Sequence, residues 1–555
     1  MKSKLLSNPL VWIIFGAFLL RMFGLTWGLP NELRNFSLHP DEQVNLLYAR
    51  QINPFQFDFA PGNYSYGTLY LTILRLGSDF VLALIGGVDP AGNISPGAMG
   101  QIHLFGRFLN CIFGAGVVGL TFGISRRVLS MPGAYISAAI VSVAPALLIH
   151  SRFQTVDMLA TMLAVATVYA CIRLIEPEAP AMKWAVLAGL FAGMSAGTKY
   201  VGIVALVALV PAVLAIKRPS LVLVAGLVAI ASFVVTTPGC IVDTDNFVKG
   251  FLFELNHSKD GHGVVFMGTP PAWFYHINNL SLGSSILTVI LGLSGLVAAL
   301  AKKSTWAMIL CSFFLIYYLA VSGGQIKFMR YVLPLIPVLA IGVGYVVQRI
   351  QEMGKEKLAI ALGIFVVGGI DTGGLVRAGS MTAKMMNEDP RDSAGRWLKS
   401  KGDVTVGLAN DPWYWSPSIQ PDIDVSRMVG QRNLFALWQS WDKPKVARYF
   451  PVNPADRFEW DVRLLTELKP NYVCASSFEY GPFNRLSEQT NGTEIEKLFG
   501  SRFREFKAVL EKDYEMVPNN EFPQNDPNHH EMVEDMEYVQ PNVIIWQRKK
   551  TSASP

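Results

Sequence analysis

The chain contains little charge for its length. Only 16% of its 555 residues are Asp, Glu, Lys or Arg, whereas about a quarter of a soluble globular protein is charged. Hydrophobic residues make up 51%, and they recur in runs near the length that crosses about 30 Å of hydrocarbon. This composition predicts a protein that spans a membrane many times.

Two other scarcities exclude further classes of protein. The chain has five cysteines and no CxxC spacing, so neither a disulfide framework nor a cysteine zinc site is expected. The net charge of +5 is small and spread through loops, which predicts no nucleic-acid partner. Membrane lipids are the expected surroundings.

The apolar segments define the expected spans. The first, 9–29, is too long for a signal peptide and lacks a small-residue cleavage site, so we interpret it as a retained span. The full set lies at roughly 9–29, 68–87, 102–124, 133–150, 156–174, 182–198, 200–216, 219–238, 278–300, 304–321, 329–347 and 357–378.

Clusters of Lys and Arg decide which segments cross the membrane. Four short basic loops lie at 125–127, 216–218, 301–303 and 349–357. With the basic N-terminus inside, all four are cytoplasmic only if segment 68–87 does not cross. That segment carries Arg75 and Asp79 and could lie in the membrane interface instead. We therefore predict eleven spans plus one interfacial helix.

The composition changes after residue 385, where no further spanning run occurs. We predict a transmembrane domain over 1–384 and an α/β domain over 385–555, on the extracytoplasmic side of the cytoplasmic (inner) membrane. The expected helices are 391–401, 461–468 and 494–510, and the expected strands are 404–409, 471–475 and 543–546.

This topology collects polar motifs on the outer face. The most informative is His39-Pro40-Asp41-Glu42, two adjacent carboxylates a few residues after the first span. The other four clusters lie at 150–157, 197–200, 243–276 and 325–331.

Ionisable groups at span ends are costly unless they are paired or functional. Arg152, Lys199 and Arg330 are cations at the depth of a lipid phosphate, which Arg and Lys can hold. Lysines and arginines at span ends also reach for headgroups without a specific ligand, so this set is a hypothesis. The histidines outside the membrane match no metal-ligand spacing, and dependence on a divalent metal stays open.

The motifs together resemble a known family. Asp41-Glu42 after the first span, Ser151-Arg152 leading to Asp157, Gly197-Thr198-Lys199-Tyr200, and Arg330-Tyr331 followed by Pro334 and Pro337 are similar to motifs of lipid-carrier-dependent glycosyltransferases. These enzymes form part of the GT-C superfamily, in the branch of protein O-mannosyltransferases and lipid A aminoarabinose transferases. The resemblance covers about two thirds of the chain.

The resemblance implies an inverting transfer of a sugar from a polyprenyl phosphate to an acceptor hydroxyl on the outer face. Asp41 would be the general base, and Glu42 would position the acceptor or the sugar. Lys199, Arg330 and Arg152 would bind the donor phosphate. The supporting residues would be Asp157, Tyr200 and Tyr331.

The sequence does not say which sugar moves, or whether the acceptor is a protein, a lipid or a glycan. One alternative is a transporter or flippase, although no internal repeat is evident and the charges sit at span ends instead of at the midplane. A scaffold or receptor anchored by its spans is a further alternative, for which eleven spans would be excessive.

Overall fold

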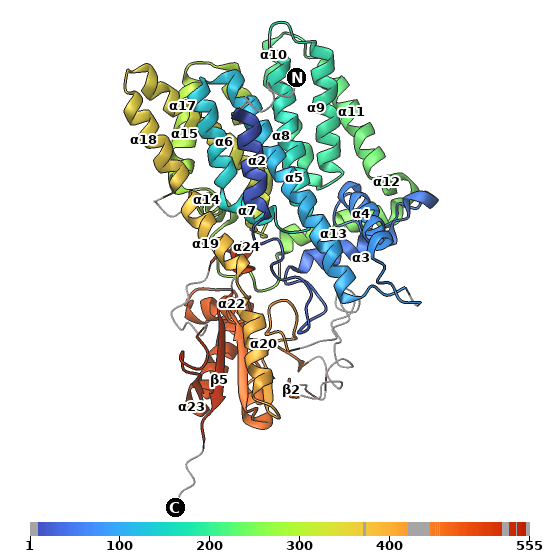
Figure 1. The fold of residues 1–555 in the computed structure, drawn as a ribbon, viewed down its shortest axis with the longest axis vertical. Helices are drawn as coiled ribbons and strands as arrows, with labels where there is room; N and C mark the ends of the chain where they lie inside the picture. The colour runs from blue at the N-terminus through green and yellow to red at the C-terminus, as the bar shows by residue number, and fades with distance from the viewer. Residues whose placement is uncertain are drawn as a thin grey trace, which may run out of the picture.

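The structure is a computed structural model that describes residues 9–90, 92–369, 373–419, 445–449, 451, 453, 456–523, 532–539 and 541–550. A helical bundle occupies one end of the molecule, and a region built on a β-sheet occupies the other (Figure 1). The two regions are described in turn below.

The bundle consists of apolar helices joined by short connections. Their bounds are α2 (Pro9–Met22), α5 (Pro96–Val128), α6 (Met131–Val143), α7 (Pro145–His150), α8 (Asp157–Leu174), α9 (Ala181–Ala196), the 3-10 helix η2 (Tyr200–Ala208), α10 (Leu209–Ala215), α11 (Leu221–Thr236), α15 (Ile286–Ala301), α16 (Thr305–Ser322), the 3-10 helix η3 (Met329–Leu335), α17 (Ile336–Glu352) and α18 (Glu356–Gly368).

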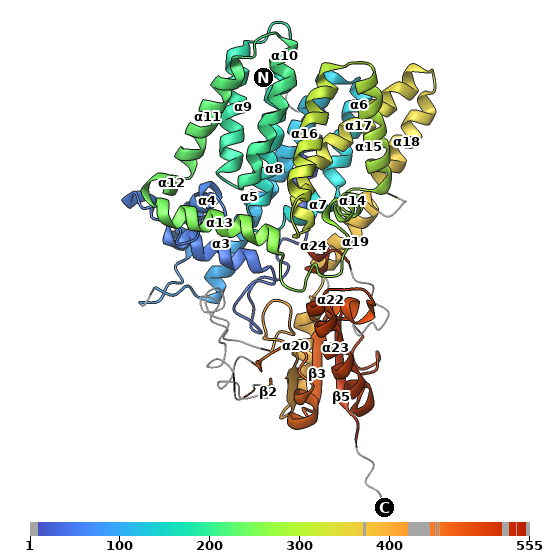
Figure 2. The same ribbon diagram turned by 180° about the vertical axis from the view of Figure 1, so that it is seen from behind.

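Shorter elements lie between the bundle and the sheet region. They are α3 (Pro40–Gln51), the 3-10 helix η1 (Pro54–Gln56), α4 (Leu69–Ile85), α12 (Gly239–Val242), α13 (Thr244–Asp260), α14 (Ala272–Gly283) and α19 (Gly374–Met386). Figure 2 shows α3 and α13 running across the base of the bundle instead of along it.

Four helical stretches among the described residues are long and apolar enough to cross a membrane unaided: α5, α8, α16 and the continuous η3–α17. A fifth candidate is the pair α14–α15, which is bent by 110°. Five further apolar stretches are shorter: α2, α6, α9, η2–α10 and α11. The protein is therefore a multi-span helical membrane protein, while the count of eleven spans stays a prediction.

The basic connections lie at one end of the bundle. The α5–α6, α10–α11, α15–α16 and α17–α18 connections are all at the end farthest from the sheet region (Figures 1 and 2). Helices α3, α4, α12 and α13 lie at the opposite end. The arrangement of these loops is the one that the distribution of Lys and Arg predicted.

Two expected spans are broken by the local chemistry. Segment 133–150 divides at Ala144, because Pro145 has no N–H to continue α6. Arg21 donates to the exposed carbonyls of Val141 and Ser142 at 3.3 Å each, which satisfies the end of α6. Segment 278–300 is also not one helix, since α14 and α15 meet at Ser284-Ser285.

Helix α4 corresponds to the segment predicted to lie in the interface. Its inner face, which includes Tyr70, Leu71 and Leu74, packs with α3 and with the outer end of α5 in one hydrophobic cluster. Arg75 donates to Asp79 at 2.8 Å and to the carbonyl of Arg50 at 2.7 Å, so the two charges noted in this segment are paired.

The C-terminal region is a mixed five-stranded sheet with helices against it. Its elements are α20 (Pro390–Ser400), β1 (Thr405–Leu408), β2 (Lys445–Ala447), the π-helix η7 (Leu464–Leu468), β3 (Tyr472–Ser476), α22 (Ser477–Glu488), α23 (Glu494–Asp513), β4 (Tyr514–Met516), α24 (Glu534–Glu537) and β5 (Val543–Arg548). The strand order is β2-β1-β3-β5-β4. Strands β2, β1 and β3 are parallel, whereas β5 is antiparallel to both β3 and β4.

Capping residues explain where several of these helices begin. Asp389 accepts from the N–H of Arg391 at 2.9 Å at the start of α20, and Thr493 with Glu496 forms a capping box at the start of α23. The predicted α/β character and all three predicted strands are present. The sequence prediction missed β2, β4, α22 and α24.

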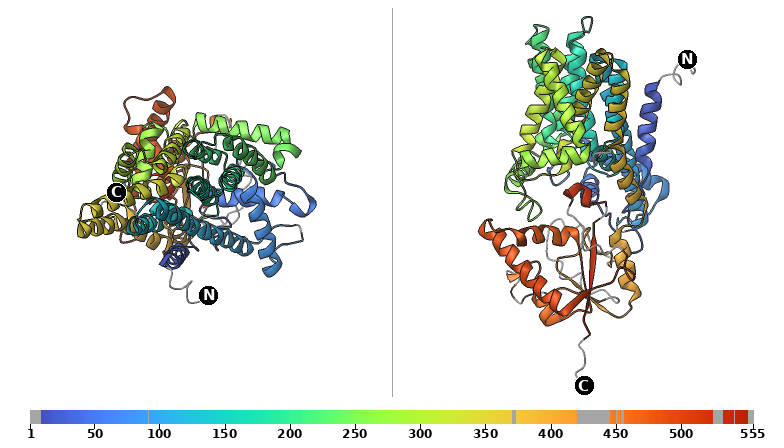
Figure 3. Two further views of the ribbon diagram at one scale, coloured as in Figure 1. Left: turned by 90° about the horizontal axis from the view of Figure 1, so that it is seen from above. Right: turned by 90° about the vertical axis from the view of Figure 1, so that its left-hand side faces the viewer.

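The C-terminal region is joined to the first outer loop by buried polar contacts. Arg34 pairs with Asp392 at 2.9 Å, and the indole of Trp27 donates to Asp389 at 3.1 Å. The right view of Figure 3 shows α24, in red, above the rest of this region and against the base of the bundle. These contacts bring the end of the chain beside its beginning.

Candidate active site

Helix α3 carries the two adjacent carboxylates in its first turn. Pro40 occupies the first helical position, where no backbone N–H is required. Acidic side chains are favoured at this end of a helix by its dipole. Because successive residues of a helix are turned by about 100°, Asp41 and Glu42 point in different directions.

Glu42 points into the protein and is completely buried. Arg107 of α5 holds it with two hydrogen bonds of 2.7 Å, and Oε1 also accepts from the N–H of Gln154 at 2.7 Å. Burial raises the pKa of Glu42, but the charge and hydrogen bonds of Arg107 outweigh this effect and lower the pKa to about 2. In this structure Glu42 anchors α3, and its burial does not support the predicted contact with acceptor or sugar.

Asp41 points the other way and keeps 26% of its side chain exposed. Its Oδ2 lies 3.3 Å from Nη2 of Arg330, at the start of η3. The same guanidinium reaches Asp535 of α24 through Nη1 at 3.1 Å. Arg330 thus bridges a half-exposed carboxylate from the beginning of the chain and a buried one from its end.

A second cation lies beside Arg330. Lys199 donates to Asp157 at 2.7 Å, and its Nζ lies 4.4 Å from the centroid of the Tyr331 ring. Lys199 keeps 14% of its side chain exposed, while Asp157 is buried. Tyr331 immediately follows Arg330, so both cations and the half-exposed Asp41 belong to one cluster.

A close backbone approach positions Lys199. Gly67 and Gly197 pack so tightly that a Cβ on Gly67 would lie 2.2 Å from the carbonyl oxygen of Gly197. Tyr200 donates to the carbonyls of Tyr64 at 2.8 Å and Tyr66 at 3.1 Å. The predicted support from Tyr200 is therefore a link between the lysine segment and the loop before α4.

Glu254 is a further acidic residue of this neighbourhood, and the sequence analysis did not single it out. It lies on α13, on the same side as Phe251, whose ring meets that of Tyr200 at 5.0 Å. Burial raises the pKa of Glu254, while Lys199 and Arg330 are close enough to lower it in part. The cluster consequently contains more carboxylates than cations.

Arg152 lies outside this cluster. Its Nη2 donates to the carbonyl of Leu20 and to the hydroxyl of Thr382, at 2.9 and 2.8 Å, and its Nε faces the carbonyl of Arg21. The side chain is buried where α2 meets α19. The position of Arg152 does not support the expectation that it binds the donor phosphate, because its hydrogen bonds serve the end of α2.

Two histidines border the cluster without forming a metal site. The ring of His39 lies between Phe153 and Tyr538, with centroids 4.3 and 4.6 Å away, and burial lowers its pKa to about 4. Nε2 of His150 lies 3.4 Å from Oδ1 of Asp535. In the part of the chain that the structure describes, no three His, Cys, Asp or Glu side chains are grouped to hold a metal ion.

The structure thus brings together Asp41, Asp157, Lys199, Arg330 and Tyr331 from the predicted set. It adds Glu254 and Asp535, and it makes Arg107 the partner of Glu42. None of these three additions lies in a recognisable motif. Asp535 in particular is about 205 residues from the arginine that it contacts.

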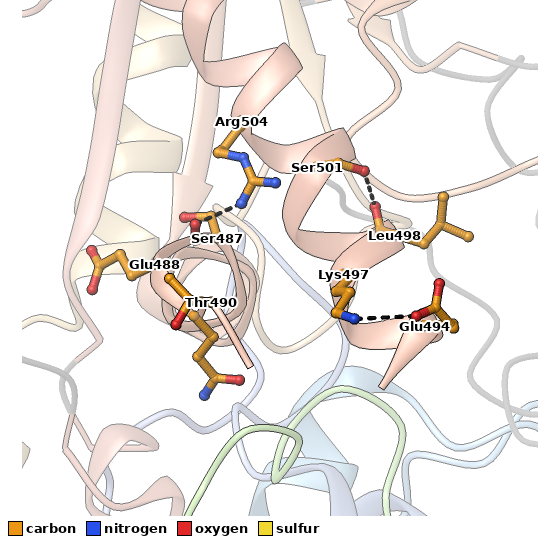
Figure 4. A pocket seen from close by; sticks show the side chains of 9 residues that line it. Ser487, Glu488, Thr490, Glu494, Lys497, Leu498, Ser501 and Arg504 are labelled. Carbon is orange, nitrogen blue, oxygen red and sulfur yellow. Dashed lines mark hydrogen bonds and ion pairs between the residues drawn. The ribbon is translucent and has the colours of Figure 1, made fainter. Parts of the chain in front are cut away.

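The open surface depressions lie elsewhere. One of about 690 Å³ lies between α22 and α23, where Lys497 pairs with Glu494 and Arg504 donates to the carbonyl of Ser487 (Figure 4). Another, of about 660 Å³, is lined by the loop after α3 and by α12 and α13. Neither includes Asp41, Lys199 or Arg330, so these depressions do not define the candidate site.

Part of the chain matches a known protein family. Residues 99–238 match the family model of dolichyl-phosphate-mannose-protein mannosyltransferases. The match covers about a quarter of the chain, from α5 to α11, and contains Asp157 and Lys199. Comparison with curated protein sequences finds no match.

Several solved structures are similar to the chain at low sequence identity. ArnT from Cupriavidus metallidurans in the apo state superposes with a TM-score of 0.51 and 14% identity, over 85% of this chain and 94% of that one. ArnT bound to undecaprenyl phosphate gives a TM-score of 0.48 and 16% identity, over 68% and 69% of the two chains. AglB from Archaeoglobus fulgidus gives 0.47 and 11%, over 98% and 88%.

The match to apo ArnT establishes the fold, and the family model establishes the kinship of the central spans. Together they confirm the predicted resemblance to lipid-carrier-dependent glycosyltransferases. Residues 99–238 are thus similar to a family of lipid-phosphate-dependent mannosyltransferases, within a fold that the chain shares with apo ArnT.

Proposed function

We propose that this protein transfers a sugar from a polyprenyl phosphate to an acceptor hydroxyl on the extracytoplasmic side of the membrane, with inversion at the anomeric carbon. The observation that carries the proposal is the half-exposed Asp41, 3.3 Å from Arg330, with Lys199 held over the neighbouring Tyr331. A base and two cations in one cluster are the groups that this reaction needs.

Asp41 acts as the general base. It accepts the proton of the acceptor hydroxyl while that oxygen attacks the anomeric carbon of the donor. The bond between the anomeric carbon and the phosphate oxygen breaks, and polyprenyl phosphate leaves with the electron pair. Because attack and departure occur on opposite faces, one displacement inverts the configuration.

Lys199 and Arg330 stabilise the departing phosphate. A phosphate oxygen that gains charge in the transition state is stabilised by cations already held in place, so no general acid is required. Both cations are paired with carboxylates in the structure, at 2.7 Å for Lys199 with Asp157 and 3.1 Å for Arg330 with Asp535. These partners fix the two side chains before the donor arrives.

The donor class follows from the relatives. The matched family model is that of dolichyl-phosphate-mannose-protein mannosyltransferases. The chain shares the fold of apo ArnT, and ArnT has also been solved with undecaprenyl phosphate bound. We assign a polyprenyl-phosphate-linked hexose or pentose to this chain on that basis. The acceptor is a protein, a lipid or a glycan.

The proposed placement has eleven spans in the cytoplasmic membrane, with α4 in the interface and residues 385–555 as an extracytoplasmic domain. The support is that the four basic connections gather at one end of the bundle, while the cluster and the sheet region lie at the other (Figure 1). Basic loops stay on the cytoplasmic side.

Turnover of the donor tests the proposal. The purified protein in lipid nanodiscs is offered a panel of polyprenyl-phosphate hexoses and pentoses, and free polyprenyl phosphate is measured by mass spectrometry. We expect release that Asp41→Asn lowers by about 10²–10⁴-fold, since the amide cannot take the proton.

The control is Asp58→Asn, an exposed aspartate in the loop after α3 whose side chain accepts from the N–H of Ala60. It should keep wild-type turnover. Movement of intact donor across the bilayer without release of polyprenyl phosphate would identify a flippase instead and overturn the proposal.

A further inference from the structure

The segment 532–539, which contains α24, is part of the membrane bundle in packing terms. Val533, Met536, Tyr538 and Val539 are buried in the same hydrophobic cluster as residues of α7, η3 and α17. Figure 3 shows α24 reaching the base of the bundle from the sheet region. This segment therefore brings the C-terminal region to the candidate site.

Further polar contacts fix the segment from the C-terminal side. Arg391 of α20 donates to the carbonyl of Tyr538 at 2.7 Å, and Ser477 of α22 donates to Glu537. Arg391 is itself paired with Asp389 at 2.8 Å. The segment is consequently held between two regions that are far apart in the sequence.

Asp535 is the residue of this segment that meets the cluster. Its Oδ2 accepts from the N–H of Met329 at 2.6 Å, and its Oδ1 accepts from Nη1 of Arg330 at 3.1 Å. Only 1% of its side chain is exposed, so it cannot contact a donor or an acceptor. Any influence on the reaction has to act through the residues that it contacts, and Arg330 is the one of these that also reaches Asp41.

The two contacts of Arg330 lie on different nitrogens. Nη1 faces Asp535 and Nη2 faces Asp41, at 3.1 and 3.3 Å. An arginine with one carboxylate partner tends to form a bidentate pair with it. Without Asp535, the guanidinium would be free to turn and pair with Asp41 through both nitrogens.

We propose that Asp535 is a positioning residue that holds Arg330 by one edge, so that the arginine faces the donor phosphate and leaves Asp41 available as the base. The inference rests on the proposed function and extends it: the C-terminal region completes the active site. Loss of Asp535 would disturb both catalytic groups at once, because Asp41 would become a permanent partner of Arg330.

The decisive variant is Asp535→Asn. The asparagine has nearly the same volume, and its oxygen can still accept from the N–H of Met329. What it removes is the charge opposite Arg330. The matched control is Asp461→Asn, which also removes a buried aspartate of the C-terminal region that pairs with an arginine, Arg463, at 2.6 Å.

We expect Asp535→Asn to lower kcat/KM by about a hundredfold, with a raised KM for the donor and an unchanged KM for the acceptor, because a displaced group near the reacting atoms costs about this much. Asp461→Asn should keep wild-type KM values for both substrates. In an Arg330→Lys background, Asp535→Asn should cost less than about threefold further, since the two residues act as one unit.

Binding of polyprenyl phosphate alone, measured by native mass spectrometry, separates this inference from the proposed function. No binding by the wild type overturns both. Binding by the wild type that Asp535→Asn leaves unchanged, together with an unchanged donor KM, overturns the positioning role alone. If Asp535→Asn does not fold, Asp535→Glu, which keeps the charge, is tested in its place. A folded Asp535→Glu whose kcat/KM stays low also counts against the positioning role.

Discussion

Asp41 and Glu42 are adjacent in the chain, yet the regions around them differ in almost every physical respect. Around Glu42, burial is complete, Arg107 forms two hydrogen bonds of 2.7 Å, and the pKa falls to about 2. Around Asp41, a quarter of the side chain is exposed and the nearest cation, Arg330, is 3.3 Å away and shared with Asp535.

This difference shows how the first turn of α3 supplies both a residue that fixes the helix, Glu42, and a candidate reactive residue, Asp41. The Glu42–Arg107 pair fixes the first turn of α3 against α5, and this turn leaves Asp41 partly exposed beside Arg330. A carboxylate whose acceptor positions are all occupied cannot take a proton from a substrate. The partly exposed Asp41–Arg330 pair is suited to catalysis, and the buried Glu42–Arg107 pair is suited to structural support.

The largest expected effect, on the yield of folded protein, comes from breaking the buried Glu42–Arg107 pair. Glu42→Gln leaves the buried guanidinium of Arg107 without its counter-charge, which typically costs about 3–5 kcal/mol. We expect little folded protein, measured as monodisperse material by size-exclusion chromatography after extraction. Asp41→Asn should be recovered at the wild-type level.

The comparison would fail if Glu42→Gln were recovered in full but were inactive, since the glutamate would then belong with the reactive groups. Arg107→Gln is the companion variant and should lose folded protein in the same way. Asp41→Asn serves as the control because it changes the adjacent carboxylate in the same manner.

A smaller effect on donor binding is expected to distinguish Lys199, a cation inside the cluster, from Arg152, a cation outside it. Lys199→Met removes a cation of the proposed phosphate site, and the lost charge-assisted contact of about 1.5–3 kcal/mol should raise the donor KM by roughly 10- to 100-fold. Arg152→Met removes a cation that binds the end of α2, so it should lower the melting temperature and leave the donor KM unchanged.

Initial rates against donor concentration, with thermal unfolding of the same preparations, check this pair of variants. A raised donor KM in Arg152→Met with normal stability would restore Arg152 to the phosphate site. An unchanged KM in Lys199→Met would remove Lys199 from it.

The smallest expected effect, on thermal stability, comes from a third carboxylate, Glu479, which is compared with Glu42. Glu479 at the start of α22 is buried like Glu42, but no arginine of the described residues hydrogen-bonds to it; burial raises its pKa to about 8. A raised pKa in the folded state means that its contribution to stability is complete below about pH 4.5 and is lost as the pH rises through about 8.

Glu479→Gln should therefore raise the melting temperature relative to the wild type at pH 9, by about 2–4 °C for each kcal/mol recovered, and change it little at pH 5. Differential scanning fluorimetry across this pH range measures the effect. Melting temperatures that change with pH in the same way for the two proteins would show that Glu479 does not titrate between pH 5 and pH 9. Its bond to the N–H of Ser476, 2.9 Å long, is one that a glutamine oxygen can keep.

Much of the fold and part of the site could be predicted from the sequence. Low charge and repeated apolar runs predicted the bundle, and the positions of Lys and Arg predicted the shared end of the four basic loops. Asp41, Lys199 and Arg330, which the structure groups in one cluster, were singled out because each lies close to the end of an apolar segment, where an ionisable residue is conspicuous.

The residues that were missed or misassigned share a different feature. Asp535 and Glu254 lie in polar segments where acids are common, and Arg107 lies inside an apolar helix whose partner is 65 residues away. Glu42 and Arg152 were placed beside the reacting groups because the sequence shows neighbours along the chain and not the direction of a side chain.

By itself, then, the sequence determined the membrane-spanning class, the shared end of the four basic loops and the carboxylate pair after the first span, because these depend on composition and on order along the chain. Only the tertiary structure decided that Glu42 is buried against Arg107, that Arg330 lies between Asp41 and Asp535, and that segment 532–539 meets this cluster. Those outcomes depend on which side chains meet across long sequence separations, and packing alone determines that.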